Sequence, residues 1–389
     1  MKKIKYLDIT GLIIFGLSLF VSRAGMNVGM GLLLISFLIK LVFDRKEMIF
    51  NNKISNYLLL IYIGGAFWNL FSDNGVSSFL IKFESQYRLL TVLLLLNAIK
   101  DRKVIKKFLI AIEISFLVSI IYGIINWFRY NEGRLQSFGG CMTYAHPLAL
   151  ALVVHLAFIF KEGKLKNKIF FIIIEILGIL ALILTQTRGA WLGFIGGAII
   201  FFILSKKYKY ILVFSVILSL TFLIMPLNFK NRVKSIVATR SDSSNNARLN
   251  LWGAAIWTYK ENIVFGSGEG NNKKWFNLYK EKEKLKDMNI YNGNSHNMYL
   301  HFLSQNGLWI ILYLFFLFYI IPKEILQRLK KNPKDFFIMG ISGGIVSFYI
   351  SGLTENVWYH EYPGYAILIL FFLLAYNSKE NNNNEVDKK

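Results

Sequence analysis

The chain has 389 residues, of which 54% are hydrophobic, and a formal net charge of +22. Its mean hydropathy of +0.44 excludes an ordinary soluble domain, which cannot bury so much apolar surface, whereas a bilayer can cover it. The lysines lie in short clusters between apolar runs, so the charge does not indicate nucleic-acid binding. A single cysteine, Cys141, excludes an internal disulfide and a cysteine-based metal cluster.

Apolar runs recur along the chain, and about 20 apolar residues in a helix span the roughly 30 Å hydrocarbon core of a bilayer. We predict an all-α polytopic membrane protein of about 12 transmembrane helices, at 7–22, 26–43, 54–72, 86–99, 108–128, 143–160, 168–186, 189–205, 209–226, 298–321, 335–353 and 359–376. The run at 86–99 is the weakest, because it is short and begins with Gln86, Tyr87 and Arg88.

Lysine and arginine are distributed unequally between alternate loops. One set of loops carries 26 of these residues, whereas the short loops and helix ends of the other set carry six. Cytoplasmic loops are enriched in Lys and Arg, so both termini are expected in the cytoplasm. The chain then divides into transmembrane helices 1–9 within 1–226, a large periplasmic loop with short helices at 227–297, transmembrane helices 10–12 within 298–376 and a polar cytoplasmic tail at 377–389.

The interval 227–297 is the only long polar stretch, and we expect any chemistry there and at the membrane ends that it faces. It contains an amphipathic run at 247–261, a glycine turn at 266–270 and a Lys/Glu-rich helical run at 273–287. The glycine turn is not followed by Lys-Ser/Thr, so it is not a phosphate-binding loop.

Arginine, unlike lysine, is concentrated on the predicted outer side. The eight arginines there are Arg23, Arg88, Arg129, Arg134, Arg188, Arg232, Arg240 and Arg248. A guanidinium group matches phosphate with a rigid fork of donors and stays charged. The set therefore favours an external site for an anion with several phosphate oxygens. For each arginine alone, interfacial anchoring or a loop ion pair is an equal alternative.

Arg188 is the most informative arginine, because it lies at the outer junction of two apolar runs, where a charge usually faces protein or a water-filled cavity. Arg129 and Arg134 lie in the connection at 129–142. Arg248 and Trp252 share one face of the amphipathic run, although position alone favours interfacial anchoring for Trp252.

His296 is the candidate base, since it ends the polar loop where an apolar run begins. A histidine at a membrane-surface cavity can accept a proton from a sugar hydroxyl, although position alone favours a structural role. No Asp-x-Asp occurs on the outer side and no Gly-x-Ser-x-Gly occurs. Once these chemistries are excluded, the candidate groups that remain are the arginines and one base. This combination indicates a transfer onto a hydroxyl group with diphosphate as the leaving group, without a metal or a cofactor.

Three segments in this order resemble the bacterial O-antigen ligase and O-antigen polymerase superfamily. They are Thr-Gln-Thr-Arg-Gly-Ala-Trp at 185–191, Ala-Arg-Leu-Asn-Leu-Trp at 247–252 leading to Phe-Gly-Ser-Gly at 265–268, and Ser-His-Asn at 295–297 followed after nine residues by Gly307. The segment from Arg134 to Gly139 is also similar to an arginine-containing segment of the family. Ile310 departs from the pattern, which often has a second glycine there, so this position does not assign a subfamily.

The resemblance implies a metal-independent, inverting glycosyltransferase with a fold of the GT-C type in the bacterial inner membrane. Its donor would be an undecaprenyl-diphosphate-linked glycan on the periplasmic face. Arg188 and Arg248 would hold the diphosphate, and His296 would deprotonate the acceptor hydroxyl. The expected substrate-binding residues are Arg134, Arg129, Asn297 and Trp252.

The favoured function is a ligase that transfers glycan to the lipid A–core oligosaccharide. A polymerase that joins repeat units and a protein O-oligosaccharyltransferase are alternatives with similar donors. From a different class, a transporter would require internal repeats and charges deep in its helices, for which Glu113 and Glu175 are the only good candidates.

Overall fold

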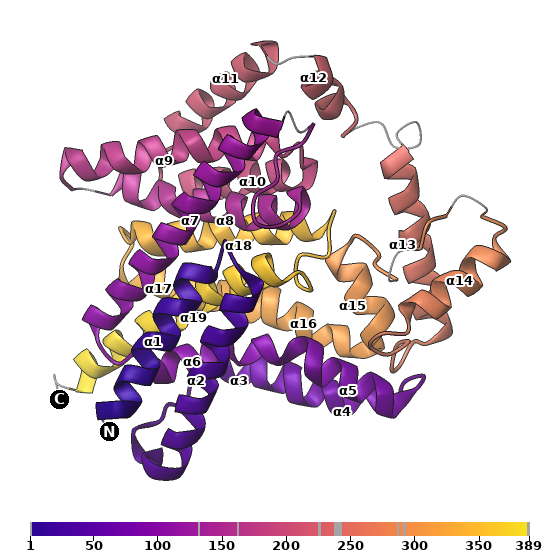
Figure 1. Ribbon diagram of the computed structural model, residues 1–389, viewed down its shortest axis with the longest axis horizontal. Helices are drawn as coiled ribbons and strands as arrows, with labels where there is room; N and C mark the ends of the chain where they lie inside the picture. Colours follow the sequence, from indigo (N-terminus) through magenta and orange to yellow (C-terminus); the bar gives the residue numbers. More distant parts are fainter. Residues whose placement is uncertain are drawn as a thin grey trace.

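The computed structural model describes residues 2–130, 133–161, 163–224, 227–236, 243–285, 288–290 and 293–386. Over this part of the chain the structure is nearly all α-helical and has no β-strand (Figure 1). The predicted all-α class is therefore confirmed. Arg240, one of the outer arginines, lies outside the described residues.

The helices before the polar loop are connected by short turns. In chain order they are α1 (Lys2–Ser18), α2 (Arg23–Phe43), η1 (Arg45–Glu47), α3 (Lys53–Leu59), η2 (Leu60–Gly64), α4 (Gly65–Asn69), α5 (Gly75–Gln86), η3 (Tyr87–Leu90), α6 (Thr91–Ala98), α7 (Arg102–Tyr130), α8 (Cys141–Phe160), α9 (Leu165–Leu184), α10 (Arg188–Leu204) and α11 (Lys209–Ile224).

The polar loop and the part after it are also helical. Their elements are α12 (Leu227–Lys234), α13 (Ser243–Glu261), α14 (Asn272–Lys282), α15 (Met298–Asn306), η4 (Gly307–Trp309), α16 (Ile310–Phe315), η5 (Phe316–Ile320), α17 (Ile321–Lys331), α18 (Phe336–Gly352) and α19 (Glu361–Val386). The runs expected at 247–261 and 273–287 correspond to α13 and α14.

Several helices have the composition of membrane spans. Within the described chain, four are long and apolar enough to cross a bilayer: Arg23–Phe43, Arg102–Tyr130, Cys141–Phe160 and Met298–Lys331. Shorter apolar helices occur at Arg188–Leu204, Lys209–Leu220, Phe336–Gly352 and Glu361–Tyr376. This pattern is consistent with a polytopic membrane protein, while the number of spans and their orientation stay predictions.

The helix expected at 86–99 differs from the observed one. A continuous helical run begins at Gly75 and passes through α5, η3 and α6 to Ala98. Its first half carries Lys82, Gln86 and Arg88, all of which are buried. Hydropathy alone missed this half because its polar side chains face protein, where partners offset the cost of burying them.

Glycines allow the central helices α8, α10 and α18 to pack closely (Figure 1). A Cβ added at Gly197 of α10 would lie 2.5 Å from the carbonyl oxygen of Gly343 on α18. Only small residues permit such an approach, which gives helices in a bilayer their van der Waals contact. The start of α10 also lies beside the end of α18, where a Cβ added at Gly189 would meet Thr354.

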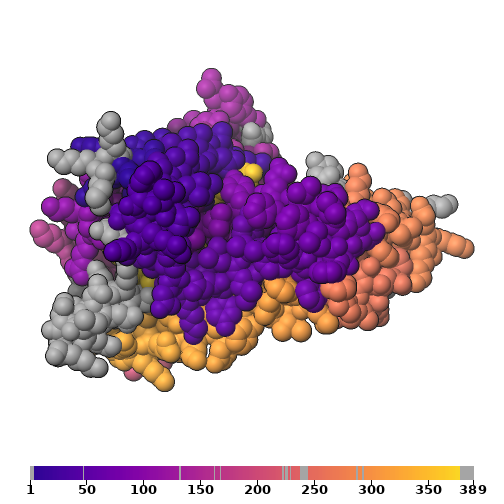
Figure 2. Space-filling model, turned by 90° about the horizontal axis from the view of Figure 1, so that it is seen from below, coloured from indigo at the N-terminus to yellow at the C-terminus, as the bar shows by residue number. Residues whose placement is uncertain are grey.

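The polar loop forms a helical lobe at one end of the molecule. α13 and α14 project there, and they make the orange end of the space-filling view (Figures 1 and 2). Their apolar faces enclose a small core of their own, formed by Leu251, Ala254, Ala255, Phe276 and Met288. The start of α1 lies at the opposite end of the molecule (Figure 1).

Candidate active site

A small cleft lies where the start of α10 meets the polar loop and the turn after α18. Its volume is only about 10 Å³, roughly the space of one water molecule, and it is lined by Arg134, Met142, His146, Thr187, Arg188, Gly189, Arg232, Arg248, Thr354 and Glu355. The structure thus brings three of the predicted site residues, Arg134, Arg188 and Arg248, to one place. The three come from separate parts of the chain.

Arg188 is the first residue of α10 and is buried. Its Nη1 donates to the carbonyl oxygen and the hydroxyl of Ser235, at 2.9 and 2.6 Å, and its Nη2 donates to Asn245 Oδ1 at 2.8 Å. The end of α12 and the start of α13 therefore hold the guanidinium plane. Gly189 is required beside it, because a Cβ there would lie 2.0 Å from Thr354 Oγ1.

The turn before α10 gathers the other arginines. Gln186 in this turn has a left-handed backbone with φ of 50°. Arg134 donates to Thr185 O at 2.9 Å and to Thr187 Oγ1 at 3.1 Å, and Arg232 donates to Gln186 O at 3.3 Å. The positive charges therefore have fixed positions around the cleft.

His296 is held beside this cleft by a buried carboxylate. Its Nδ1 lies 2.9 Å from Glu355 Oε1 and 3.0 Å from Oε2. His360 Nε2 is 3.5 Å from the same Oε1. Glu355 follows α18 and has an exposed fraction of only 1%, whereas the His296 side chain is 32% exposed.

The environment of Glu355 favours its ionised form. Burial alone would raise the pKa of this carboxyl, but the hydrogen bonds and charges of His296 and His360 outweigh burial and hold the pKa well below its usual range. An ionised carboxylate orients the imidazole by accepting from Nδ1–H, which leaves Nε2 to act as the base. Among the described residues, Nε2 of His296 has no hydrogen-bond partner.

The backbone at His296 is strained in a way that serves this contact. Its φ of 48° is left-handed, which is uncommon for a residue other than glycine. The Asn294 side chain accepts from the His296 backbone N–H at 2.9 Å. Asn297 caps α15 by accepting from the N–H groups of Tyr299 and Leu300 at 3.0 Å, and it donates to Leu353 O at 3.0 Å.

The remaining predicted residues have different surroundings. Asn297 uses its side chain to tie α15 to the end of α18, next to His296 in the chain, and it does not line the cleft. Trp252 lies half-buried one helical turn after Arg248 on α13. Arg129 is exposed at the end of α7, with its guanidinium 5.5 Å from the Tyr130 ring centre, and does not line the cleft.

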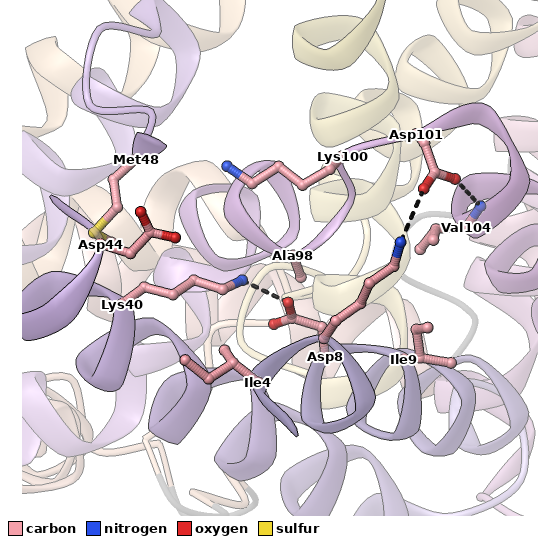
Figure 3. A pocket seen from close by; sticks show the side chains of 11 residues that line it. Ile4, Asp8, Ile9, Lys40, Asp44, Met48, Ala98, Lys100, Asp101 and Val104 are labelled. Carbon is pink, nitrogen blue, oxygen red and sulfur yellow. Dashed lines mark hydrogen bonds and ion pairs between the residues drawn. The ribbon is translucent and has the colours of Figure 1, made fainter. Parts of the chain in front are cut away.

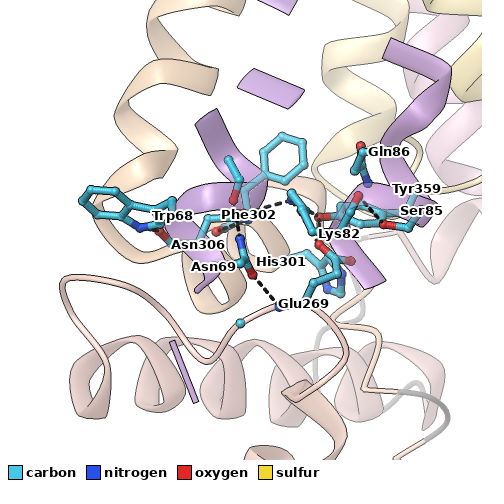
Figure 4. Close-up of polar contacts among 12 residues, drawn as sticks. Trp68, Asn69, Lys82, Ser85, Gln86, Glu269, His301, Phe302, Asn306 and Tyr359 are labelled. Carbon is cyan, nitrogen blue, oxygen red and sulfur yellow. Dashed lines mark hydrogen bonds and ion pairs between the residues drawn. The ribbon is translucent and has the colours of Figure 1, made fainter. Parts of the chain in front are cut away.

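Sequence reasoning did not single out Glu355, and it did not single out the buried cluster around Lys82. Lys82 is 0% exposed, and its Nζ donates to Glu269 Oε2 at 3.0 Å and to Asn306 Oδ1 at 2.9 Å (Figure 4). The Tyr359 hydroxyl donates to the same Glu269 oxygen at 3.0 Å. For Glu355, the signal in the sequence was the polar segment 354–356 between two apolar runs. For Lys82, it was a single lysine among the apolar residues of 79–83.

This cluster anchors the glycine turn of the polar loop. The Glu269 backbone N–H donates to Asn69 Oδ1 at 2.8 Å, which ties the turn to α4 as well as to α5. Gly266, Gly268 and Gly270 all have positive φ, so the chain can fold back at this point. The turn is therefore a docking element that fixes the polar loop on the helical bundle.

The cleft therefore places several guanidinium groups, which match phosphate oxygens in geometry, beside a carboxylate-paired histidine that can accept a proton. Residues 173–317 match the family model described as O-antigen ligase. The matched segment includes Arg188, Arg248 and His296, but not Arg134 or Glu355. The resemblance to the O-antigen ligase and polymerase superfamily is thereby confirmed.

Two curated proteins are similar to this chain. The ComP-specific O-oligosaccharyltransferase of Acinetobacter baylyi is 24% identical over 307 residues, which are 74% of this chain and 53% of that protein. An uncharacterized protein of Haemophilus influenzae is 26% identical over 173 residues, 41% of this chain and 43% of that protein. The chain spans about half the length of the curated relatives it matches. The matches support a glycosyltransferase-type enzyme.

Proposed function

We propose that this protein transfers a glycan from undecaprenyl diphosphate to a hydroxyl group of the lipid A–core oligosaccharide, as an O-antigen ligase. The observation that carries the proposal is the arrangement of Arg134, Arg188, Arg232 and Arg248 around a cleft that Glu355 also lines, while the same Glu355 contacts His296. The arginines match a diphosphate in charge and donor geometry. The cleft is too small for the glycan, which would extend beyond it.

In the proposed reaction, Nε2 of His296 removes the proton of the acceptor hydroxyl. The resulting oxygen attacks the anomeric carbon, and the bond from this carbon to the diphosphate oxygen breaks with inversion. Arg188 and Arg248 stabilise the charge that develops on the departing diphosphate. Glu355 stays ionised and stabilises the imidazolium. The guanidinium groups supply the positive charge, so we propose that the transfer needs no metal ion or cofactor.

We place the cleft on the periplasmic side of the bacterial inner membrane, with both termini in the cytoplasm. Support comes from the 26 to six distribution of Lys and Arg between alternate loops. The start of α1 lies at the opposite end of the molecule from the lobe of α13 and α14 (Figure 1). We propose about 12 spans and a GT-C-like fold, with the apolar helices contacting the polyprenyl tail of the donor.

The second candidate is a protein O-oligosaccharyltransferase. It is favoured by the relative in Acinetobacter baylyi, which carries that name and aligns with 74% of this chain. The two functions share the donor and the base, and they differ only in which hydroxyl reaches His296. Polymerisation, in which the hydroxyl belongs to a second lipid-linked glycan, is the remaining alternative with this chemistry.

The test uses purified protein in nanodiscs with undecaprenyl-diphosphate-linked glycan, truncated lipopolysaccharide and EDTA. We expect wild type to form a higher-mass lipopolysaccharide, and Arg188→Ala, Arg248→Ala and His296→Ala each to lose about 100-fold or more in rate. Arg45→Ala, which alters an exposed arginine in η1, is the control and should keep activity.

The other outcomes separate the candidates. Transfer to an added pilin-like protein, but not to lipopolysaccharide, would replace the ligase with a protein oligosaccharyltransferase. Growth of the lipid-linked glycan without an acceptor would identify a polymerase. No transfer to any of these hydroxyls would reject the enzyme.

A further inference from the structure

One buried histidine of the arginine cleft takes no part in the reaction proposed above. His146 lies in the second turn of α8, its exposed fraction is 3%, and it lines the cleft beside the arginines. α8 packs against both α10 and α18, so the imidazole has a fixed position. The Cε1 edge of its ring faces the start of α10, where a Cβ added at Gly189 would lie 3.4 Å from it.

The imidazole of His146 has no hydrogen-bond partner. Its Nδ1 is enclosed by protein without a partner, and Nε2 also has none among the described residues. Buried polar side chains are almost always hydrogen-bonded, so an unpartnered ring that lines a cleft is available to a ligand. Because Nδ1 is enclosed, Nε2 is the ring nitrogen that can contact a ligand in the cleft.

The larger cavity of about 310 Å³ at the other end of the helical bundle differs in this respect (Figure 3). Lys40 Nζ donates to Asp8 Oδ2 at 2.5 Å and to Asn97 O at 3.0 Å, while the Ser36 hydroxyl donates to Asp8 Oδ1 at 2.6 Å. The buried charges there satisfy each other, so they do not call for a ligand. The buried imidazole of the arginine cleft has no such partner.

The size and charge of the cleft indicate which kind of atom His146 contacts. A space of about 10 Å³ accommodates one water-sized group, such as a single phosphate oxygen, and not a sugar ring. Four guanidinium groups and the Glu355 carboxylate line this space, which therefore has a net positive charge. A protonated imidazole would add repulsion to these cations, whereas a neutral one supplies an N–H donor without adding charge. An oxygen that is negatively charged and only accepts hydrogen bonds fits both features.

We propose that Nε2–H of His146 donates a hydrogen bond to a phosphate oxygen of the lipid-linked diphosphate. The inference rests on the proposed function, since it takes the diphosphate as the ligand of the cleft. His146 contacts the leaving group, whereas His296 takes the proton of the acceptor. A hydrogen bond to a charged oxygen is stronger than a neutral one, so His146 contributes both to binding and to stabilisation of the departing diphosphate.

The first readout is the affinity of the purified protein for undecaprenyl diphosphate, without a glycan, and for undecaprenol, by native mass spectrometry. We expect wild type to prefer the diphosphate. His146→Leu should weaken diphosphate binding about tenfold or more, because one hydrogen bond to a charged group is lost, and should leave undecaprenol binding unchanged. His146→Gln should restore most of the affinity, since its amide can donate a hydrogen bond but cannot act as a base.

The second readout is the melting temperature, which separates ligand binding from a structural role. His146→Leu removes two ring nitrogens that have no partner, so it should keep or raise the melting temperature. His155 is the matched control, because it is buried on the same helix, its Nε2 lies 3.2 Å from Glu113 Oε2, and it does not line the cleft. His155→Leu should lower the melting temperature, since Glu113 loses its partner, and should keep the affinity for the diphosphate.

Equal diphosphate affinity of wild type and His146→Leu would overturn this inference and leave the proposed function standing. Equal loss of affinity in His146→Leu and His146→Gln would also overturn it, because the amide would then fail to replace the donor. If wild type binds undecaprenyl diphosphate no better than undecaprenol, the cleft is not a diphosphate site, and the proposed function fails together with the inference.

Discussion

Glu355 and His296 are 59 positions apart in the chain, and their side chains meet at 2.9 Å between Oε1 and Nδ1. The carboxylate comes from the turn between α18 and α19, and the imidazole comes from the end of the polar loop. The contact therefore fixes the loop end against the helical bundle at the edge of the arginine cleft. It also gives the imidazole one orientation, which a proton acceptor requires.

Replacing the carboxylate should impair transfer without removing the base. We expect Glu355→Gln to lower the rate on the order of 100-fold, because the amide can hold the wrong tautomer of His296 and does not stabilise the imidazolium. Transfer rates measured from about pH 5 to pH 9 test this effect.

Glu361→Gln is the matched control, since this carboxylate lies six positions later and pairs with Arg23 at the surface, at 3.3 Å. It should keep the wild-type rate and profile. A Glu355→Gln enzyme that matches wild type at every pH would show that the contact has no part in the reaction.

Stability should depend on the ionisation of Glu355 at acidic pH. Burial by itself would raise its pKa, but His296 and His360 hold the pKa well below the usual 4.5. A depressed pKa contributes stability above the unfolded value, and this contribution is lost as the pH falls through the folded pKa. The difference in melting temperature between wild type and Glu355→Gln should shrink as the pH falls below roughly 5. A difference that grows below pH 4.5 would contradict this assignment.

The helical class and much of the site follow from local sequence. The amphipathic run predicted at 247–261 lies within α13, and the tight turn before Arg188 is found where the polar Thr-Gln-Thr segment interrupts two apolar runs. Arginines stand out in such a chain because lysine carries most of its charge. Local patterns sufficed here because each signal is contained in a few neighbouring residues.

Contacts between distant segments could not be predicted in this way. In the sequence, Glu355 is one polar residue in a short turn, and only the folded structure shows that it contacts His296. The sequence predicts that Lys82 lies at the outer end of a helix, but in the structure it is paired with Glu269, 187 positions away. Hydropathy treats each residue as if it faced lipid, so it fails where a charge is matched inside the protein.

The close approach of Gly189 to Thr354 predicts a steric effect on the cleft. A Cβ at position 189 would lie 2.0 Å from Thr354 Oγ1, so Gly189→Ala must displace the side chain of Thr354, the residue next to Glu355. We expect at least a tenfold loss of transfer, in keeping with the cost of a displacement of about 1 Å near a reacting group. Activity of the purified variant and its melting temperature give the two readouts.

Two further variants make this prediction specific. Gly31→Ala places a Cβ where nothing lies within 4 Å, so it should leave activity unchanged. The double variant Gly189→Ala/Thr354→Ala removes the clashing hydroxyl and should recover part of the lost activity. Failure of the double variant to recover any activity, while Thr354→Ala alone is active, would show that the clash is not the cause.

Among the contacts between the polar loop and the helical bundle, the buried pair of Lys82 and Glu269 should be the one whose loss destabilises the protein most. Lys82→Met keeps the length of the side chain but leaves the Glu269 carboxylate buried without its cation, which costs about 3–5 kcal/mol. Glu269 would retain only the Tyr359 hydroxyl. We expect a clear fall in melting temperature and faster proteolysis of the loop.

The double variant Lys82→Met/Glu269→Gln separates two causes of destabilisation, the burial of an unpaired charge and the change in side-chain packing. A neutral amide can still accept from Tyr359, and no buried charge is left unpaired, so stability should recover most of the way to wild type. Lys274→Met is the control, because its 2.7 Å pair with Asp73 lies at the surface, where an ion pair contributes about 1 kcal/mol or less. Equal destabilisation by Lys82→Met and Lys274→Met would refute a special role for the buried pair.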